Sequence, residues 1–320
     1  EFVQLKDAAT NSIVDEVFRG GVSITKADAD WHTSEPQGDA TLAGNEYQII
    51  NRSQNAVFMR ESMESYAPGE AVMTLKTEWN EEKQAYVAST AKSSLPYGTY
   101  EIVETKAAEG YNNAEWSATF TIRQEGEMHY FDRTEEGTSG PNSEYVFHHQ
   151  WNENEVMRGG IIVGKVDRET GQYLSLGEAH LDGAVFEIIN RSKQPVYVNG
   201  ETYDVGDVVM NITTEQMEWN EETIYAATTG NNVLPYGTYE VREIKSGEGY
   251  LYDSTSKAYT KTVQIRDEGQ MVDLTDEADA VANQVLREDW HFKKKAEDSM
   301  ERMDQIAFLV TSMTTGEQHV

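Results

Sequence analysis

The sequence repeats itself at long range, and this duplication limits the possible folds more than any other feature. The phrase LPYGTYEIVETKAAEGY at 95–111 returns as LPYGTYEVREIKSGEGY at 234–250. The repeat unit is about 130 residues, the size of a whole domain. Further segments match in the same order: GGVSITKADAD (20–30) with GGIIVGKVDRE (159–169), LAGNEYQIINRS (42–53) with LDGAVFEIINRS (181–192), TEWNEE (77–82) with MEWNEE (217–222), and FTIRQEGEM (120–128) with VQIRDEGQM (263–271). The pattern predicts two copies of one domain in tandem.

The junctions between the copies indicate where each domain begins and ends. NEVMRGGIIVGKVD (154–167) resembles DEVFRGGVSITKAD (15–28), and in both segments an Asn or Asp precedes a Lys by 11 positions. The short linkers this implies favour a stiff rod of domains. We expect the chain to be part of a longer protein, with these divisions: the last strand of a truncated domain at 1–19, complete domains at 20–155 and 159–284, and the first strands of a further domain at 287–320.

Each copy contains short runs in which apolar and polar residues alternate. In the first copy these runs are VSITK, EYQII, VFMRE, TYEIVE, ATFTIR and YVFHH. They are rich in Val, Ile, Thr, Tyr and Phe, and turn residues separate them about every ten positions. This spacing is typical of an all-β, Ig-like sandwich with about seven strands per domain.

The charge and the absence of cysteine exclude several functional classes. The formal net charge is −30, from 26 basic and 56 acidic residues. Nucleic acids and anionic membrane surfaces would repel such a chain, so neither is an expected partner. No apolar run approaches the roughly 20 residues that a membrane helix needs, so no membrane insertion is expected. With no Cys, the chain cannot form disulfides, Cys-ligated zinc sites or thiol nucleophiles.

Metal and turnover sites find little support in the sequence. His129, His148 and His149 are candidate ligands, but neighbouring residues in a strand point to opposite faces, so we predict no metal site. Asp28 and Asp30 are interpreted as part of a solvated face rather than a calcium site. No nucleophile–base triad, phosphate loop or glycosidase-type carboxylate pair stands out. We therefore expect no cofactor and no turnover enzyme.

The repeated motifs, taken together, resemble the collagen-adhesin B-type (CNA-B, SpaA-like) domains. These motifs are a Lys-x-Asp opening strand, L-x-G-x-x-[FY]-x-[IL], YGTYE-x-x-E-x-K-x-x-x-GY, and a closing Asn before the next domain. The resemblance covers nearly the whole chain. It implies prealbumin-like β-sandwiches of the kind found in stalks and pilin subunits of Gram-positive surface proteins. It also implies an extracellular location, with attachment to the cell wall through a segment outside this sequence.

The same resemblance implies a covalent cross-link, because many members of the family hold a self-formed Lys–Asn isopeptide bond with an acidic residue as proton shuttle. Carried over by position, the bonds would join Lys26 to Asn154 through Glu104, and Lys165 to Asn283 through Glu243. Asn152 is an alternative to Asn154, because both lie on one face of HHQWNEN; Asn154 is preferred because Asn283 occupies its place in the junction pattern. Asp15 and Lys294 would serve neighbouring truncated domains and should lack partners here.

This chemistry explains why these residue types are needed. An amine attacks a carboxamide only when it is neutral, and burial lowers the pKa of a lysine while raising that of a glutamic acid. The buried acid can then move protons as ammonia leaves, and close alignment of the reacting groups supplies the rest. Consistent with a shared role, Lys26 and Glu104 are 78 positions apart, as are Lys165 and Glu243. The reaction occurs once per bond, so it is autocatalysis rather than turnover.

Two further repeated features are interpreted as structural. Trp79 and Trp219 recur at matched positions and are predicted to pack at the edge of a core. The NRS segments at 51–53 and 190–192 are formal glycosylation sequons without an assigned role.

Two functions remain open from the sequence. The first is a structural stalk of a surface adhesin or pilin-like protein, whose partners are the neighbouring domains of the same chain. The second is direct binding of a host ligand, such as a matrix protein or an immunoglobulin. The binding surfaces would then be the insertion between Tyr47 and Trp79 and the loop at 132–144. An exposed aromatic patch there would favour binding.

Overall fold

The computed structural model describes residues 15–133, 137–138, 145–252, 259–289, 291–313 and 316–320. These residues form strands and turns, and no helix among them is long and apolar enough to cross a membrane. The chain divides between Met157 and Arg158 into two compact units, called unit 1 and unit 2, except that Arg266–Glu268 group with unit 1. The division falls between the two predicted domains, whose outer boundaries remain predictions.

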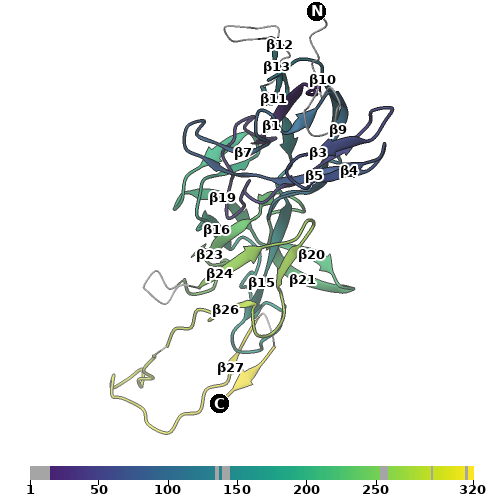
Figure 1. The fold of residues 1–320 in the computed structure, drawn as a ribbon. Helices are drawn as coiled ribbons and strands as arrows, with labels where there is room; N and C mark the ends of the chain where they lie inside the picture. Colours follow the sequence, from purple (N-terminus) through teal and green to yellow (C-terminus); the bar gives the residue numbers. More distant parts are fainter. Residues whose placement is uncertain (1–14, 134–136, 139–144, 253–258, 290, 314–315) are drawn as a thin grey trace, which may run out of the picture. The chain divides into compact units, whose positions relative to one another are not determined.

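Unit 1 contains a large mixed sheet in which the strand β1 is central. The path through this sheet is β12-β13-β11-β1-β7-β6, and β8 and β14 also pair with β1. Figure 1 labels β12, β13, β11, β1 and β7 of this sheet. The strands of this sheet in the described residues are β1 (Arg19–Asp28), β6 (Glu78–Asn80), β7 (Ala85–Ser89), β8 (Leu95–Pro96), β11 (Met128–Arg133), β12 (Gly137–Thr138), β13 (Val146–Gln150) and β14 (Asn152–Asn154).

A second, antiparallel sheet faces the first and completes the sandwich of unit 1. Its order is β10-β9-β2-β5, and a separate hairpin, β3–β4, lies in the insertion between β2 and β5. The bounds are β2 (Glu46–Asn51), β3 (Val57–Met59), β4 (Glu64–Tyr66), β5 (Ala71–Lys76), β9 (Gly98–Lys106) and β10 (Ser117–Ile122).

Unit 2 repeats this arrangement. Its β15 pairs with β21, β22, β25 and β26, while β20 extends the sheet from β21; the facing sheet has the order β19-β16-β23-β24, and β17–β18 is the matching hairpin. The bounds are β15 (Arg158–Asp167), β16 (Val185–Asn190), β17 (Val196–Val198), β18 (Glu201–Tyr203), β19 (Val208–Thr213), β20 (Glu215–Trp219), β21 (Glu222–Thr228), β22 (Leu234–Pro235), β23 (Gly237–Lys245), β24 (Thr260–Ile265), β25 (Met271–Leu274) and β26 (Val281–Asn283). Beyond them lies the short hairpin of β27 (Val310–Thr311) and β28 (Gln318–His319).

The fold confirms the prediction of tandem all-β sandwiches. All six alternating runs of the first copy lie wholly or mostly in strands; VSITK, for example, is part of β1 and TYEIVE is part of β9. The alternation has the expected cause, because buried residues alternate along β2 and β9 so that one face of their sheet covers the core.

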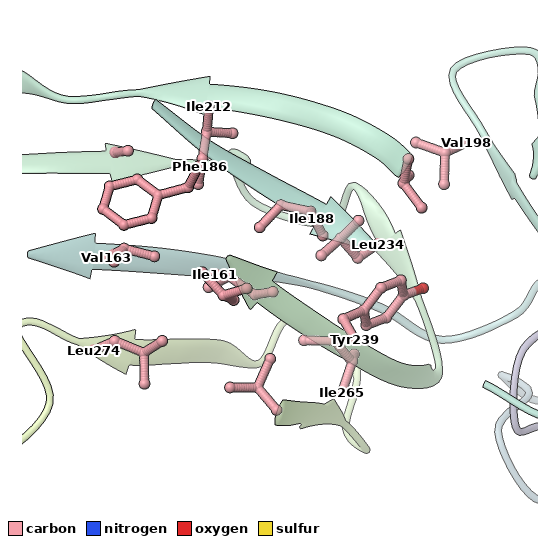
Figure 2. Close-up of a cluster of buried hydrophobic side chains, with 14 of the residues drawn as sticks. Ile161, Val163, Phe186, Ile188, Val198, Ile212, Leu234, Tyr239, Ile265 and Leu274 are labelled. Atoms are coloured by element: carbon pink, nitrogen blue, oxygen red, sulfur yellow. The ribbon is translucent and has the colours of Figure 1, made fainter. Parts of the chain in front are cut away.

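The core of each unit lies between its two sheets. In unit 2 it joins apolar side chains from both layers, and Figure 2 shows the labelled members gathered between the strands. These labelled residues are Ile161, Val163, Phe186, Ile188, Val198, Ile212, Leu234, Tyr239, Ile265 and Leu274. Unit 1 has a matching cluster that includes Val22 and Ile24 of β1 and Tyr100 and Ile102 of β9.

The strand β1 differs from its neighbours because all ten of its residues are buried. Its pairing explains this: β7 and β8 pair antiparallel with it, and β11 and β14 pair parallel. Gly20 permits the close approach at its start, since a Cβ there would lie 2.4 Å from the carbonyl oxygen of Glu127. A polar side chain near the other end of this strand, such as that of Lys26, therefore enters the interior.

Candidate functional site

In unit 1 the structure brings the predicted lysine and glutamate together in the core. β1 runs parallel to the closing strand β14, with Lys26 directly opposite Asn152. Glu104 reaches across from β9 in the facing sheet, and its Oε1 lies 3.6 Å from Lys26 Nζ. The side chains of Lys26 and Glu104 are both 0% exposed. The 78-position spacing thus places an amine and a carboxyl group in contact in a site closed to solvent.

The two candidate asparagines occupy different places around this pair. Lys26 Nζ donates a hydrogen bond to Asn152 Oδ1. Asn154 instead donates from Nδ2 to Glu104 Oε1 at 2.7 Å, and its own Oδ1 is buried without a partner among the described residues. Asn152 Nδ2 lies 3.5 Å from Glu104 Oε2. The lysine therefore contacts Asn152, while Asn154, the residue preferred from the sequence, contacts the glutamate.

Tyr47 is a member of this cluster that the sequence analysis missed. It lies on β2 opposite Glu104, is fully buried, and donates from its hydroxyl to Asn152 Oδ1 at 2.8 Å. Phe186 occupies the matched position in unit 2, opposite Glu243. Tyr47 and Asn152 of unit 1 correspond to Phe186 and Val281 of unit 2. A comparison of the two copies for matched positions that differ together would have identified Tyr47.

Unit 2 holds the shared part of the cluster without this polar pair. Glu243 Oε1 lies 3.6 Å from Lys165 Nζ and accepts a hydrogen bond from Asn283 Nδ2 at 2.9 Å. Val281 stands opposite Lys165, and its backbone carbonyl accepts from Nζ at 3.1 Å. A buried lysine, a glutamate and an asparagine therefore converge in both units.

Burial sets the electrostatics of both clusters. Desolvation lowers the pKa of Lys26 to about 7 and that of Lys165 to about 8, and in each case the adjacent glutamate opposes the shift. Desolvation also raises the pKa of Glu243, against the attraction of Lys165. The neutral form of each lysine is therefore accessible near neutral pH, and burial favours the protonated form of Glu243.

Asp28 corrects the prediction of a solvated face. It is fully buried, and its Oδ2 accepts hydrogen bonds from Tyr111 Oη at 2.7 Å and Gln37 Nε2 at 3.0 Å. Asp30 is half-buried and accepts from the same Gln37. These bonds tie the turn after β1 to the loop around Tyr111. The described residues contain no group of three or more His, Cys, Asp or Glu side chains suited to a metal ion.

The three histidines considered as metal ligands make contacts on the two faces of β13. His149 Nε2 lies 2.9 Å from His129 Nδ1, while His148 Nδ1 lies 2.7 Å from Asp132 Oδ1. Adjacent residues of β13 thus point in opposite directions, which is the geometry assumed in the sequence analysis.

The matched tryptophans differ in their surroundings. Trp219 packs against a small buried cluster that includes Ile162 and Ile224, as predicted for the edge of a core. Trp79 is 44% exposed and makes an edge contact with Tyr86 at 5.2 Å. The prediction of core-edge packing therefore fits Trp219 better than Trp79.

The asparagines of the NRS segments are buried loop anchors. Asn51 accepts from the backbone N–H of Ser53 at 2.9 Å and donates to the carbonyls of Asn55 and Tyr66 at 3.0 and 2.9 Å. Asn190 is bonded in the same way in unit 2 and is likewise fully buried. These side chains hold the loop and hairpin that follow β2 and β16, which explains why NRS is repeated.

The remaining predicted residues lie on the surface. Asp15 and Lys294, the counterparts assigned to neighbouring domains, are both exposed. The insertion between Tyr47 and Trp79 forms the β3–β4 hairpin, which exposes Phe58 by 43% and Met63 by 72%. The second predicted binding loop lies mostly outside the described residues.

Comparison with known proteins identifies a family and several similar structures. The family model described as "SpaA: Prealbumin-like fold domain" matches residues 20–135 and 159–278. The Bacillus anthracis TIE protein is 23% identical, with a TM-score of 0.45 over 83% of this chain and 34% of that chain. The C-terminal fragment of the pilus adhesin SpaC from Lactobacillus rhamnosus GG is 16% identical, with a TM-score of 0.39 over 84% of this chain and 99% of that one. The minor pilin GBS52 of Streptococcus agalactiae is 15% identical, with a TM-score of 0.27 over 86% and 100%.

The chain thus spans about a third of the length of the TIE protein, 34% of that chain. No curated protein sequence matches it.

Proposed function

The chain belongs to the SpaA family of prealbumin-like fold domains, and from this premise we propose that it is a stalk segment of a Gram-positive surface protein whose units are closed by intramolecular Lys–Asn isopeptide bonds. The observation that carries the proposal is the buried Lys–Glu–Asn cluster, which recurs in both units with Lys–Glu distances of 3.6 Å. Lys26 would react with an asparagine of β14, and Lys165 with Asn283.

The reaction in each unit joins the first strand to the last. The neutral lysine amine attacks the carboxamide carbon, so the Nζ–Cγ bond forms, the Cγ–Nδ2 bond breaks, and ammonia leaves. Glu104 or Glu243 takes the proton from Nζ and returns one to the departing nitrogen. No other reactant is needed, because the groups are held together in the folded core.

The cross-link would stabilise each unit chiefly by restricting its unfolded state. Lys26 and Asn152 are 126 positions apart in the chain. Closing a loop of that length stabilises a fold by roughly 5 kcal/mol on the chain-entropy argument used for disulfides. A chain without cysteine would gain this stability from a bond that reducing agents do not break.

A stalk of this kind would stand outside the cell, attached to the wall through a segment beyond this sequence. Its partners would be the neighbouring domains of the same protein, and a host-surface or matrix protein would bind elsewhere, at the tip. The strongly acidic composition suits a well-solvated extracellular spacer.

Intact-mass spectrometry of the purified chain tests the proposal. The parent should be lighter than its sequence mass by two ammonias. Glu104→Ala and Glu243→Ala should each be lighter by only one, after allowance for the substitution. Glu101→Ala is the matched control. Glu101 lies on β9, as Glu104 does, but its carboxylate pairs with Arg52. This variant should still show the loss of two ammonias. A parent at its full sequence mass would overturn the proposal.

Direct ligand binding is the second candidate function, favoured by the exposed Phe58 and Met63 on the β3–β4 hairpin. A double variant, Phe58→Ser with Met63→Ser, should bind immobilised matrix proteins more weakly than the parent does. Both mass losses should persist in the variant. Equal binding by the two proteins would exclude this surface.

A further inference from the structure

Resting on the proposed cross-link, we propose that the acceptor in unit 1 is Asn152 rather than Asn154, and that the Tyr47 hydroxyl assists by holding the reacting carbonyl oxygen. The inference concerns which amide the lysine attacks and which group stabilises the charge that develops. It gives unit 1 a reaction site that unit 2 does not share.

The first support is the position of the amine. Lys26 is directly opposite Asn152 in the parallel pair of β1 and β14, and its Nζ contacts Asn152 Oδ1. The contact of Asn154 is with Glu104, through Nδ2 at 2.7 Å. Attack requires the amine to reach the amide carbon. The carboxamide of Asn152, which already contacts Nζ, is therefore the better placed of the two for attack.

The second support is the hydrogen bond from Tyr47. Its hydroxyl donates to Asn152 Oδ1 at 2.8 Å, the atom that gains negative charge when the amine adds. Burial, together with the charge of Glu104, raises the pKa of Tyr47 well above its ordinary value, so the hydroxyl keeps its proton. A fixed donor in a dry site favours such a charge far more than water would.

The third support is unit 2, which serves as an internal comparison. There Phe186 replaces Tyr47 and Val281 replaces Asn152, while the lysine, the glutamate and the second asparagine remain. The tyrosine and the asparagine thus occur together or not at all. The fold accommodates either pair, so folding alone does not require the polar one.

The complete step can be written with these groups. The neutral Lys26 Nζ attacks Cγ of Asn152, and the charge on Oδ1 is held by the Tyr47 O–H. Glu104 takes the Nζ proton through Oε1, 3.6 Å away, and the leaving Nδ2 is protonated from Oε2, 3.5 Å away. The Nζ–Cγ bond forms, the Cγ–Nδ2 bond breaks, and one ammonia is released.

Peptide mapping of the purified chain identifies the acceptor. After proteolysis, tandem mass spectrometry should find a branched peptide that joins Lys26 to Asn152, with the Asn154 side chain intact. Fragment ions that divide residues 152, 153 and 154 separate the two assignments. A branch at Asn154 would overturn the inference.

The same maps keep the two proposals apart. If unit 1 carries no branch while Lys165 is joined to Asn283, the inference fails and the cross-linked stalk survives in unit 2. If neither unit carries a branch, the proposed function itself fails. Asn154→Ala should retain the unit 1 branch at Asn152 and its mass loss, and loss of both would overturn the inference. Asn152→Val copies the residue of unit 2, so any branch that it still forms in unit 1 should lie at Asn154.

A kinetic comparison tests Tyr47. Chain recovered in denaturant before cross-linking is refolded, quenched at intervals, and analysed by intact mass and mapping. Tyr47→Phe should slow closure of unit 1 by about 10²-fold, the usual effect of losing one such donor. Unit 2 of the same molecules should close at the parental rate, and tryptophan fluorescence should show parental refolding. Equal closure rates for unit 1 in parent and variant would remove Tyr47 from the mechanism.

Discussion

The buried lysines are the residues whose environment departs most from their ordinary preference. Before reaction, Lys26 has a pKa of about 7 in the folded chain, against an ordinary value of 10.5. Between these values the unfolded state binds more protons than the folded state, so the free energy of unfolding of an open unit rises with pH. In the proposed reaction, converting the amine to an amide would remove this penalty.

The rate of closure should therefore depend on pH. Only the neutral amine reacts, so closure should accelerate as pH rises through about 7 in unit 1 and about 8 in unit 2. Refolding the denatured, open chain at a series of pH values and following the loss of ammonia by mass gives both profiles. Rates that stay constant from acid pH to pH 9 would show that deprotonation of the lysine does not limit the reaction.

Asn190 illustrates a residue whose importance is structural. Its side chain makes bonds to Ser192, Gln194 and Tyr203 in a site closed to water. Asn190→Ala would leave these buried backbone groups unpaired and should destabilise unit 2 by about 2–3 kcal/mol. Thermal denaturation followed by circular dichroism measures this, with the exposed Asn231→Ala as control. Equal melting temperatures for the two variants would contradict the assigned anchor role.

At this scale the sequence identified the residues that both copies share. Lys26 and Glu104 were found because their spacing recurs in Lys165 and Glu243, and the structure brings each pair into contact. Tyr47 was missed because it occurs in one copy only. Contact between β14 and β1 decides which asparagine meets the lysine, and no local pattern encodes that register.

Among the elements, β1 is the one on which the sandwich of unit 1 depends. Its neighbours approach so closely that Gly20→Ala would force a Cβ to 2.4 Å from the carbonyl oxygen of Glu127. The backbone must shift to accept it, and the expected cost is about 1–3 kcal/mol in the stability of unit 1.

Thermal melting of Gly20→Ala against Gly137→Ala tests this expectation. Gly137 is the matched control, because a Cβ added there meets nothing within 4 Å and its φ does not require glycine. Gly20→Ala should melt at a lower temperature than both the parent and the control. Melting at the control's temperature would show that the strands can separate slightly without penalty.

The regular elements were predictable from alternation, and the irregular ones were not. Runs such as those in β2 and β9 alternate because one face of their sheet is buried. The short strands of the β3–β4 hairpin lack that signal; Arg19 helps to fix this hairpin by donating to the carbonyl of Phe58. The parallel pairing of β1 with β14 joins residues far apart in sequence, so only the folded chain reveals it.

For the whole molecule, the expectation is two separately closed units. Lys26→Met and Lys165→Met each remove one amine while filling its space with a flexible apolar side chain. Each single variant should lose one closure, and the double variant should lose both, with a roughly additive fall in stability of about 5 kcal/mol per unit. Melting temperature and resistance to proteolysis at elevated temperature measure this. A double variant as resistant as the parent would show that the bonds contribute no stability.

The parallel neighbours β1 and β14 have a mechanical consequence. The chain enters unit 1 along β1 and leaves after β14, so tension applied to the two ends of a closed unit would meet the proposed cross-link first. Force would then cross one amide bond and bypass the chain between Lys26 and Asn152, which are 126 positions apart. Fully extended at about 3.4 Å each, those residues would otherwise lengthen the molecule by on the order of 400 Å. A closed unit therefore acts as an inextensible link, and a bacterium held by such a stalk would keep its distance from a surface under shear.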